Sequence, residues 1–346
     1  MTRPTSAPKL ADIAKRAQVS IAAVSIALNK GESTRVSADR RKKILRIAEE
    51  LGYVPNELAK ALAEQKTHLL GLVVPLRDPI FFNHFIAQAL SGIQSALMRR
   101  GYHLLVYSPS GKPGRMTRDQ ILESKFTDGL IFINTRSCTA QDVSDTIEEL
   151  QRAQIRFSMI NSYYGRAPIN YVGVDDTAIG AAAAEYLISR GHRRIAFLSG
   201  LATLPAHQHL VTGLRRGLAE RGLTLPSDRI GCTGYEKGNV RLILDEWFRT
   251  KRDRPSAIFT ADDQLLMHFY DYAEQRALKL PEDVAVLGRG NAGLSEHLRP
   301  RPTTLTIPTF RMGELAADLL IDSIENPDTQ PQRVFLPYEL VPGTTA

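Results

Sequence analysis

Two kinds of hydrophobic spacing divide this chain. Between Lys9 and Leu51, apolar residues recur every three or four positions, which is the spacing of one buried helix face. From His68 onward, short apolar runs alternate with stretches of helical spacing, and such runs are typical of strands that are buried on both faces. The pattern therefore predicts a small all-helical unit followed by a larger α/β region.

Three short helices are expected in the first unit. A tight turn at residues 17–19 separates the first two, and Ser20 is placed to cap the second. A third helix begins after Ser37 and ends at Gly52. The residues expected to face inward are Leu10, Ile13, Ala14, Ala17, Val24, Ala27, Leu28, Ile44, Ile47, Ala48 and Leu51. This arrangement is typical of a helix-turn-helix DNA-binding unit.

The larger region predicts a doubly wound α/β fold. Its helices include residues 83–100, residues 176–190 and one that ends near Arg221, each closed by a following glycine. The apolar runs between helices are LLGLVV, HLLVYS, GLIFIN, RFSMIN, YVGVD, RIAFLSG, AIFT and VAVLG. About ten strands are too many for one tidy parallel sheet, so we expect two lobes, each with its own sheet.

The distribution of charge adds to the helix-turn-helix interpretation. Most of the net charge of +7 lies in residues 1–66, which hold 13 Lys and Arg against 7 Asp and Glu. Charge alone would not establish nucleic-acid binding, because basic solvated helix faces are common. Combined with the motif, it supports contact with phosphate.

The chain shows no signal for export or membrane insertion. Its first residues, MTRPTSAPK, lack the apolar core of a signal peptide, and no run approaches the roughly 18 apolar residues of a membrane span. Cys138 and Cys232 are far apart and in no C-x-x-C spacing, so we expect both to be reduced and packed. We expect a cytoplasmic protein that binds no membrane and needs no cofactor.

Several linked segments resemble one family. They are LADIAKRAQVS, ALN at 27–29, RVSADRRKKIL, ELGYVPN at 50–56 and AKALAEQKT at 59–67. In this order they resemble the DNA-binding head and hinge of the lactose-repressor family of bacterial transcription regulators, and a weaker pattern extends the resemblance over nearly the whole chain. The resemblance implies a transcription regulator, expected to be a repressor, that a small molecule such as a sugar controls from the cleft between two lobes.

The resemblance also implies a domain plan. It comprises a disordered tail at 1–8, an all-α helix-turn-helix head at 9–55, a hinge helix at 56–66 and a two-lobed α/β effector-binding and dimerisation domain, similar to periplasmic binding proteins, at 67–346. The N-lobe would hold residues 67–166 and 298–328, and the C-lobe residues 167–290 and 333–346. The three chain crossings would lie near 165–169, 290–298 and 328–333. The chain ends without a heptad tail, so a dimer is expected rather than a tetramer.

One helix-turn-helix reaches only a few base pairs, so we expect two heads of a homodimer on a palindromic DNA operator. Phosphate contacts are expected from Lys9, Ser20, Ser25, Asn29, Lys30 and residues 40–43, each of which could also be an ordinary solvated side chain.

The base-reading positions are apolar where the family has polar residues, and they are Ile21, Ala22, Ala23 and Ile26. Such side chains can meet thymine methyls but make no hydrogen bonds to bases. Specificity would then depend on methyl contacts and DNA deformation, or the head would bind loosely; alternatively, Ile26 packs into the head.

The hinge carries a candidate minor-groove wedge. Leu62 occupies the position at which the family inserts a leucine at the operator centre, with Lys60 and Ala61 against the groove walls. Asn56 can cap the hinge helix, which is too short to be stable alone and is expected to fold only in the DNA-bound dimer. The same turn could also be a linker helix packed on the effector domain.

The family pattern places effector-binding candidates at strand ends in the cleft. They are Phe81, Phe82, Asn161, Asp175, Tyr235 and Asp262, with His207, His209 and Arg289 nearby. The two phenylalanines could instead be core residues, and the two aspartates could cap the helices that follow them. Two departures from the family pattern change the expected cleft. Leu210 stands where the family has an arginine, and Gly290 stands where it has the aspartate of its G-Y-D or G-F-D turn. The effector would then be bound differently, be more apolar or be bound weakly.

Two other functions fit parts of the sequence. Residues 288–293 satisfy G-x-G-x-x-G, as in a nucleotide-dependent enzyme, but Pro300 and Pro302 follow where a βαβ unit would need a helix. A solute-binding protein would carry a signal peptide where this chain has its head. His207 and His209 form an H-x-H pair without a third ligand, so no metal is expected. We expect a DNA-binding regulator rather than an enzyme, with an atypical or absent effector as the alternative.

Overall fold

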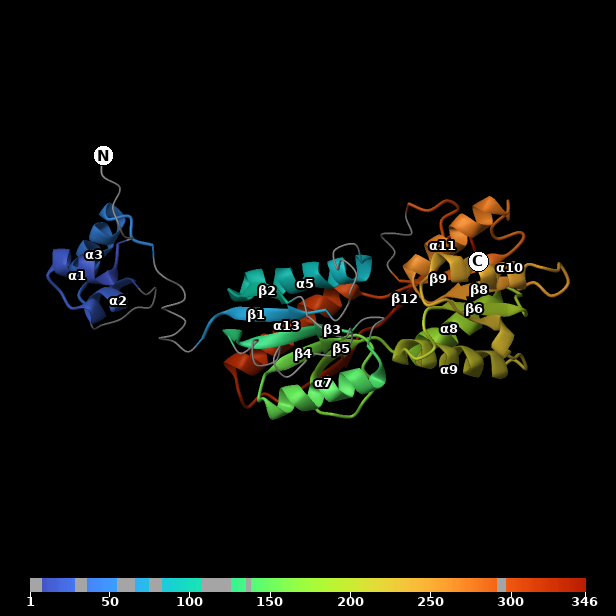
Figure 1. Ribbon diagram of the computed structural model, residues 1–346, viewed down its shortest axis with the longest axis horizontal. Helices are drawn as coiled ribbons and strands as arrows, with labels where there is room; N and C mark the ends of the chain where they lie inside the picture. Colours follow the sequence, from blue (N-terminus) through green and yellow to red (C-terminus); the bar gives the residue numbers. More distant parts are fainter. Residues whose placement is uncertain are drawn as a thin grey trace. The chain divides into compact units, whose positions relative to one another are not determined.

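The computed structural model describes residues 8–28, 36–54, 66–74, 83–107, 126–134, 138–290 and 297–346. The chain divides into two compact units, Met1–Thr67 and His68–Ala346 (Figure 1). The first is helical and the second is α/β, so the two structural classes that the hydrophobic spacing predicts are confirmed. None of the described helices is long and apolar enough to cross a bilayer.

The smaller unit is a helix-turn-helix head. Its helices within residues 8–28 and 36–54 are α1 (Leu10–Ala17), α2 (Ile21–Leu28) and α3 (Ala38–Glu50). They enclose a cluster of the residues predicted to face inward. Ser20 caps α2, since its Oγ accepts a hydrogen bond from the Ala23 amide at 3.1 Å. Ser37 occupies the N-cap of α3 without such a bond, and Gly52 closes that helix in a left-handed conformation with φ of +64°. The expected hinge at 56–66 lies almost wholly outside the described residues.

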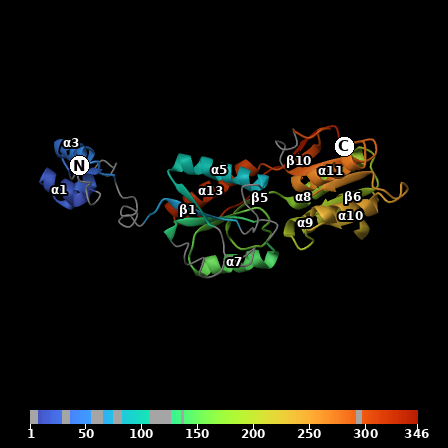
Figure 2. The same cartoon turned by 45° about the horizontal axis from the view of Figure 1, so that its top comes forward.

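The N-lobe of the larger unit is built on a parallel sheet. The described strands run in the order β11-β5-β4-β3-β1-β2. They are β1 (Leu69–Val73), β2 (His103–Tyr107), β3 (Gly129–Ile133), β4 (Phe157–Ile160), β5 (Asn170–Gly173) and β11 (Arg333–Phe335). Helices α5 (His84–Arg100) and α13 (Thr309–Glu325) lie side by side on one face, and α7 (Ala140–Arg152) covers the other (Figures 1 and 2). Because side chains alternate along a strand, Ile131 joins the core under α5 and α13 while Phe132 packs with α7.

The C-lobe has the same plan. Its described strands run in the order β12-β10-β9-β8-β6-β7, parallel except for β12 at the edge. They are β6 (Ile195–Ser199), β7 (Ile230–Cys232), β8 (Ala257–Thr260), β9 (Ala285–Gly290), β10 (Thr303–Thr306) and β12 (Glu339–Val341). The helices are α8 (Asp176–Ser189), α9 (Pro205–Ala219), α10 (Lys237–Trp247) and α11 (Asp263–Gln275), with a short 3₁₀ turn at Ser227–Arg229. Cys138 is buried as expected, whereas Cys232 at the end of an edge strand is exposed.

The chain crosses between the lobes later than the sequence predicts. β5 pairs with β4 in the N-lobe, so the first crossing follows Gly173 instead of lying at 165–169. β10 pairs with β9 in the C-lobe, so the second follows Thr306 instead of lying at 290–298. β11 pairs with β5, so the third follows Phe335 instead of lying at 328–333. The physical reason is the same each time. One more strand pairs with the sheet of its lobe, which satisfies the backbone hydrogen bonds of that strand, and only then does the chain pass to the other lobe.

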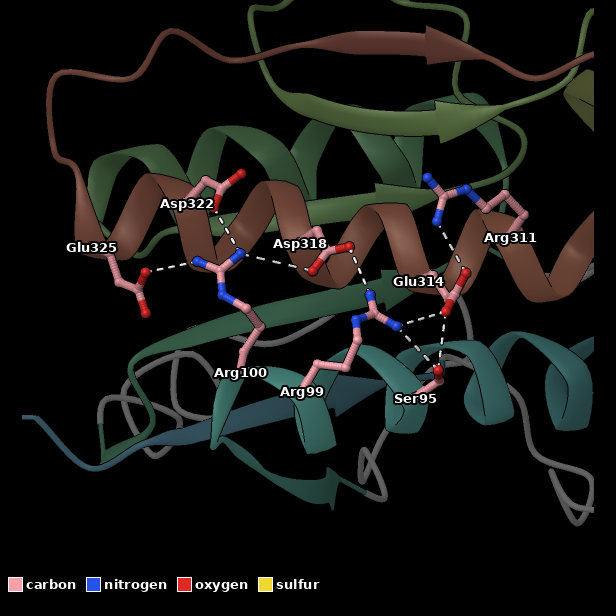
Figure 3. A network of polar contacts seen from close by, with 8 residues as sticks. All are labelled: Ser95, Arg99, Arg100, Arg311, Glu314, Asp318, Asp322 and Glu325. Atoms are coloured by element: carbon pink, nitrogen blue, oxygen red, sulfur yellow. Dashed lines mark hydrogen bonds and ion pairs between the residues drawn. The ribbon is translucent and has the colours of Figure 1, made fainter.

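Ion pairs join α5 to α13 along the outside of the N-lobe (Figure 3). Arg99 pairs with Glu314 at 2.8 Å and with Asp318 at 3.1 Å. Arg100 pairs with Asp322 at 2.8 Å. Glu314 is the most enclosed of these carboxylates, since only 13% of its side chain is exposed. Its partner Arg99 thus links the two helices at that point.

Candidate nucleic-acid interface and ligand cavity

The outer face of α2 is formed by the predicted base-reading residues. Val24 and Ala27 point into the core of the head. Ile21 is 53% exposed, Ala22 and Ser25 are exposed, and Ile26 is half-buried outside the hydrophobic cluster of the head. The alternative in which Ile26 belongs to the head's core is therefore not what the structure shows. Ala23, also expected at this face, is half-buried.

The basic residues of the head fall into two groups. Arg41 and Lys43 of α3 donate to the carbonyls of Ala27 and Ala17, both at 3.2 Å, and so hold the ends of α2 and α1. Lys9 at the start of α1 is exposed, as are Arg40 and Lys42. Ser20 uses its hydroxyl to cap α2. The other expected DNA contacts, Asn29, Lys30, Asn56, Lys60, Ala61 and Leu62, lie outside the described residues.

A cavity of about 290 Å³ lies between the carboxyl ends of the strands of the two lobes. Of the predicted effector residues, those that line it are Asn161, His207, Leu210, Tyr235, Asp262 and Arg289. Polar lining residues that the sequence analysis did not single out are Asn83, His84, Asn134, Ser162, Ser199, Asp263, Gln264 and Thr309. Phe81 and Phe82 lie outside the described residues. The loops after strands of both sheets thus converge on one site.

Two predicted effector residues are placed elsewhere. Asp175 is exposed and caps α8, accepting a hydrogen bond from the Ala178 amide at 2.9 Å. His209 stacks on Tyr164 at 3.6 Å between ring centroids, and its Nδ1 lies 3.0 Å from the Thr177 hydroxyl. Both side chains therefore serve helix capping and packing instead of lining the cavity. His207 has different neighbours, so the two histidines do not form a metal pair.

Asp262 combines the two uses that the sequence left open. It caps α11 by accepting a hydrogen bond from the Leu265 amide at 2.9 Å, and it also lines the cavity. The difference from Asp175 is position, because α11 begins at the cavity wall whereas the exposed end of α8 does not.

Arg289 is held by a buried carboxylate. Its guanidinium lies 2.5 Å from the carboxylate of Asp176, which is fully buried, and donates to the carbonyl of Ala261 at 3.2 Å. Burial is the largest single effect and opposes the charged guanidinium. The charge and hydrogen bond of Asp176, together with Tyr164 and Asp262, exceed it in sum, so the pKa of Arg289 is raised above its ordinary value. The Tyr164 hydroxyl donates to the same carboxylate. Its pKa is raised by burial and by Asp176, so it remains a neutral donor.

Asp263 supplies a carboxylate next to Gly290, the position at which the family pattern has an aspartate. A Cβ at Gly290 would lie 2.3 to 2.4 Å from the carboxylate atoms of Asp263. The carboxylate from the first turn of α11 therefore occupies the space that a side chain at 290 would need. The signal available in the sequence was the second aspartate of Ala261-Asp262-Asp263 directly after a buried strand.

His207 contributes a neutral polar group to the cavity wall. It is 8% exposed, and its Nδ1 lies 2.8 Å from the Ser199 hydroxyl. Burial, followed by the positive charge of Arg215, lowers the pKa of the imidazole below its ordinary value. The described wall thus presents amides, hydroxyls, a neutral imidazole and two carboxylates, which can accept hydrogen bonds from ligand hydroxyl or amino groups.

Comparison with known proteins identifies relatives of both units of the chain. Residues 9–56 match the model for bacterial regulatory proteins of the lacI family, and residues 184–346 match that for a periplasmic binding protein-like domain. The ribose operon repressor of Escherichia coli (strain K12) is 30% identical over 329 residues, which cover 94% of this chain and 96% of that protein. The HTH-type transcriptional regulator DegA of Bacillus subtilis (strain 168) is 29% identical over 335 residues, 95% of each chain.

A solved structure extends the agreement to three dimensions. The complex of the transcriptional regulator CelR with cellobiose is 26% identical, has a TM-score of 0.71 and is matched over 98% of this chain and 100% of that one. The relatives are transcription regulators and not enzymes. The head, the two-lobed domain and these similarities together show that the chain belongs to the lacI family of bacterial regulatory proteins.

Proposed function

We propose that this protein is a homodimeric repressor that binds a palindromic operator and changes its operator affinity when a small molecule fills the cavity between its lobes. One observation carries the proposal: the same chain has a head with an outward-facing second helix and a two-lobed domain with a polar cavity at the strand ends. The first part is suited to the major groove and the second to a ligand.

The proposed effector is a sugar or a related metabolite. Two relatives are a ribose operon repressor and a regulator in complex with cellobiose, and the cavity wall can form hydrogen bonds with hydroxyl groups. Asn161, His207, Tyr235, Asp262 and Arg289 are the effector contacts that we retain from the sequence, and Asp263 is added from the structure. Leu210 supplies an apolar patch in place of a charge.

Dimerisation is proposed from the reach of one head. A single second helix covers only a few base pairs, so useful affinity needs two heads related by two-fold symmetry on a palindrome. Asn29 and Asn56 with Lys60, Ala61 and Leu62 of the hinge remain proposed DNA contacts. Replacing Leu62 by Ala should weaken operator binding without unfolding the protein, because the minor-groove wedge would be lost.

The test is a selection of duplexes from a random library by the full-length protein at moderate salt. We expect enrichment of a palindrome, and a truncated chain lacking residues 1–66 should enrich none. The ligand is sought by thermal shift with ribose, cellobiose and related sugars, and each hit is then added to the operator-binding assay. The proposal fails if no duplex is preferred over random DNA with or without these sugars.

A further inference from the structure

The outer face of α2 has little capacity for hydrogen bonding to bases. Successive residues of a helix are separated by 100°, so Ile21, Ala22, Ser25 and Ile26 are neighbours on one side, opposite Val24 and Ala27. Three of these four outward residues are apolar, and the serine hydroxyl is the one polar side-chain group among them. Ile21 is 53% exposed.

The surroundings of this face indicate what covers it. The head as a whole is basic, with 13 Lys and Arg against 7 Asp and Glu in residues 1–66. Lys9, Lys15, Arg40 and Lys42 are exposed on the helices that flank α2 in the sequence. An apolar protein partner would not require this charge, whereas a DNA duplex matches it through its phosphates. An apolar strip on a basic head fits the major groove.

Thymine is the base with a matching apolar group in that groove. Each base pair shows donors and acceptors there, and only thymine adds a methyl group. We propose that α2 reads its operator mainly through the 5-methyl groups of thymines, which contact Ile21, Ala22 and Ile26, while Ser25 makes the polar contact. This inference rests on the proposed function and adds the chemical feature of the operator that the protein recognises.

The size of the effect follows from the burial of a methyl group. Burying one such group contributes about 0.8 kcal/mol, which corresponds to a change in affinity of about four-fold. Duplexes selected by the full-length protein should therefore carry thymine at the positions under α2 in each half-site. Each of those thymines should contribute about this factor.

Deoxyuridine provides the decisive probe, because it lacks only the methyl group and keeps every hydrogen-bonding atom of thymidine. Selected operator duplexes are synthesised with deoxyuridine at the thymines under α2, and their affinity for the full-length protein is measured. We expect a loss of about four-fold per methyl removed. Deoxyuridine placed outside the half-sites is the control and should leave the affinity unchanged.

A matched set of protein variants assigns the effect to α2. In an Ile21→Ala, Ile26→Ala double variant the deoxyuridine penalty should shrink, because the partner of the methyl group is gone. In Ser25→Ala the affinity should fall while the penalty stays as in the parent. Since Ile21 and Ile26 lie outside the core of the head, the double variant should melt like the parent, and its melting curve is recorded as a check.

Three results would overturn the inference. These are selected half-sites without thymine under α2, an affinity that does not change with deoxyuridine, and an unchanged penalty in the double variant, which would assign the effect to duplex flexibility. Failure to enrich any duplex is a different result, because it would overturn the proposed function itself and this inference with it.

Discussion

Gly290 shows how one small residue preserves the chemistry of the cavity. The resemblance led us to expect a cleft without a carboxylate at this position, yet the carboxylate of Asp263 lies in the space next to the Gly290 Cα. The glycine is required twice, since its φ of +155° is also a conformation that other residues rarely adopt. The first turn of α11 thus supplies a carboxylate to this part of the cavity wall.

Replacing Gly290 by Ala should destabilise the larger unit by about 1 to 3 kcal/mol, because the new Cβ displaces Asp263 and strains the backbone. The measurement is the melting temperature of the full-length protein. Gly238→Ala is the control, since a Cβ at Gly238 near the start of α10 meets nothing within 4 Å. Equal losses in the two variants would show that the position of Asp263 is not the cause.

His207 should make stability depend on pH. Its pKa is lowered by burial and then by Arg215, so the folded protein binds this proton less readily than the unfolded chain. The stability is therefore complete above the ordinary histidine pKa of about 6.5 and falls as the pH drops below it. His207→Asn should reduce the decline in melting temperature between about pH 7.5 and 5.

His192 provides the comparison for that experiment. Burial lowers its pKa as well, so the parent protein combines two contributions in the same pH range. Each single variant should remove its own share, and the His192→Asn, His207→Asn double variant should remove both. A slope that is unchanged in His207→Asn would contradict the assignment of a buried neutral imidazole to the cavity wall.

Sequence reasoning found only some of the residues that line the cavity. Asp175 and Asp262 carry the same signal, an acidic residue between a buried strand and a helix, and both cap their helices. Only the three-dimensional position of the helix start decides which one also faces the ligand. His207 and His209 are similar, because two residues along α9 is a rotation of about 200°, which points one ring to the cavity and the other to Tyr164.

At the scale of helices and strands, the pairing of α5 with α13 offers the clearest electrostatic test. Hydrogen bonding from Arg99 is the main reason why the pKa of Glu314 is lowered. A lowered carboxyl pKa contributes stability that is present above the ordinary value near 4.3 and is lost as the pH falls through the folded value. Glu314→Gln should therefore melt at a lower temperature than the parent at pH 7, and the difference should shrink toward pH 3.

Glu246→Gln is the matched control for this prediction. Glu246 pairs with Arg249, three residues further along the chain, and 64% of the Glu246 side chain is exposed. Exposed pairs of this kind contribute little, so the variant should melt like the parent at every pH. An equal effect of both variants would mean that the ion pair between α5 and α13 (Figure 3) contributes no more stability than an exposed pair.

The strands that the sequence missed have two physical causes. Buried strands such as β1, β3 and β8 are continuous apolar runs and were predicted, whereas the edge strands β7, β11 and β12 span only three residues each. β10 was missed because its Thr303 and Thr304 are fully buried although threonine is polar. Since the second and third crossing points are set by the sheets that β10 and β11 join, these lobe boundaries could not be read from hydrophobic spacing alone.

At the scale of the whole effector unit, Tyr164 joins the lobes next to the cavity, by a hydrogen bond and by its stacking on His209. Tyr164 belongs to the loop between β4 and β5 of the N-lobe, and it donates to Asp176 at the start of α8 in the C-lobe. Asp176 also holds Arg289 in the cavity wall. A ligand that contacts Arg289 is therefore linked through one buried carboxylate to the relative position of the two lobes.

Replacing Tyr164 by Phe should reduce the influence of the ligand on operator affinity. A hydrogen bond to a charged group contributes about 1.5 to 3 kcal/mol, which is the size of a typical allosteric coupling of about 1 to 3 kcal/mol. The ratio of operator affinities with and without the sugar found by thermal shift should move toward one. By reciprocity, the effect of operator on sugar affinity should shrink by the same factor. Tyr163→Phe is the control, because its hydroxyl accepts from the Ala167 amide within the N-lobe, and the coupling should persist there. If both variants keep the parental ratio, the lobes communicate by another route, because a hydrogen bond whose removal leaves the ratio unchanged contributes no coupling free energy.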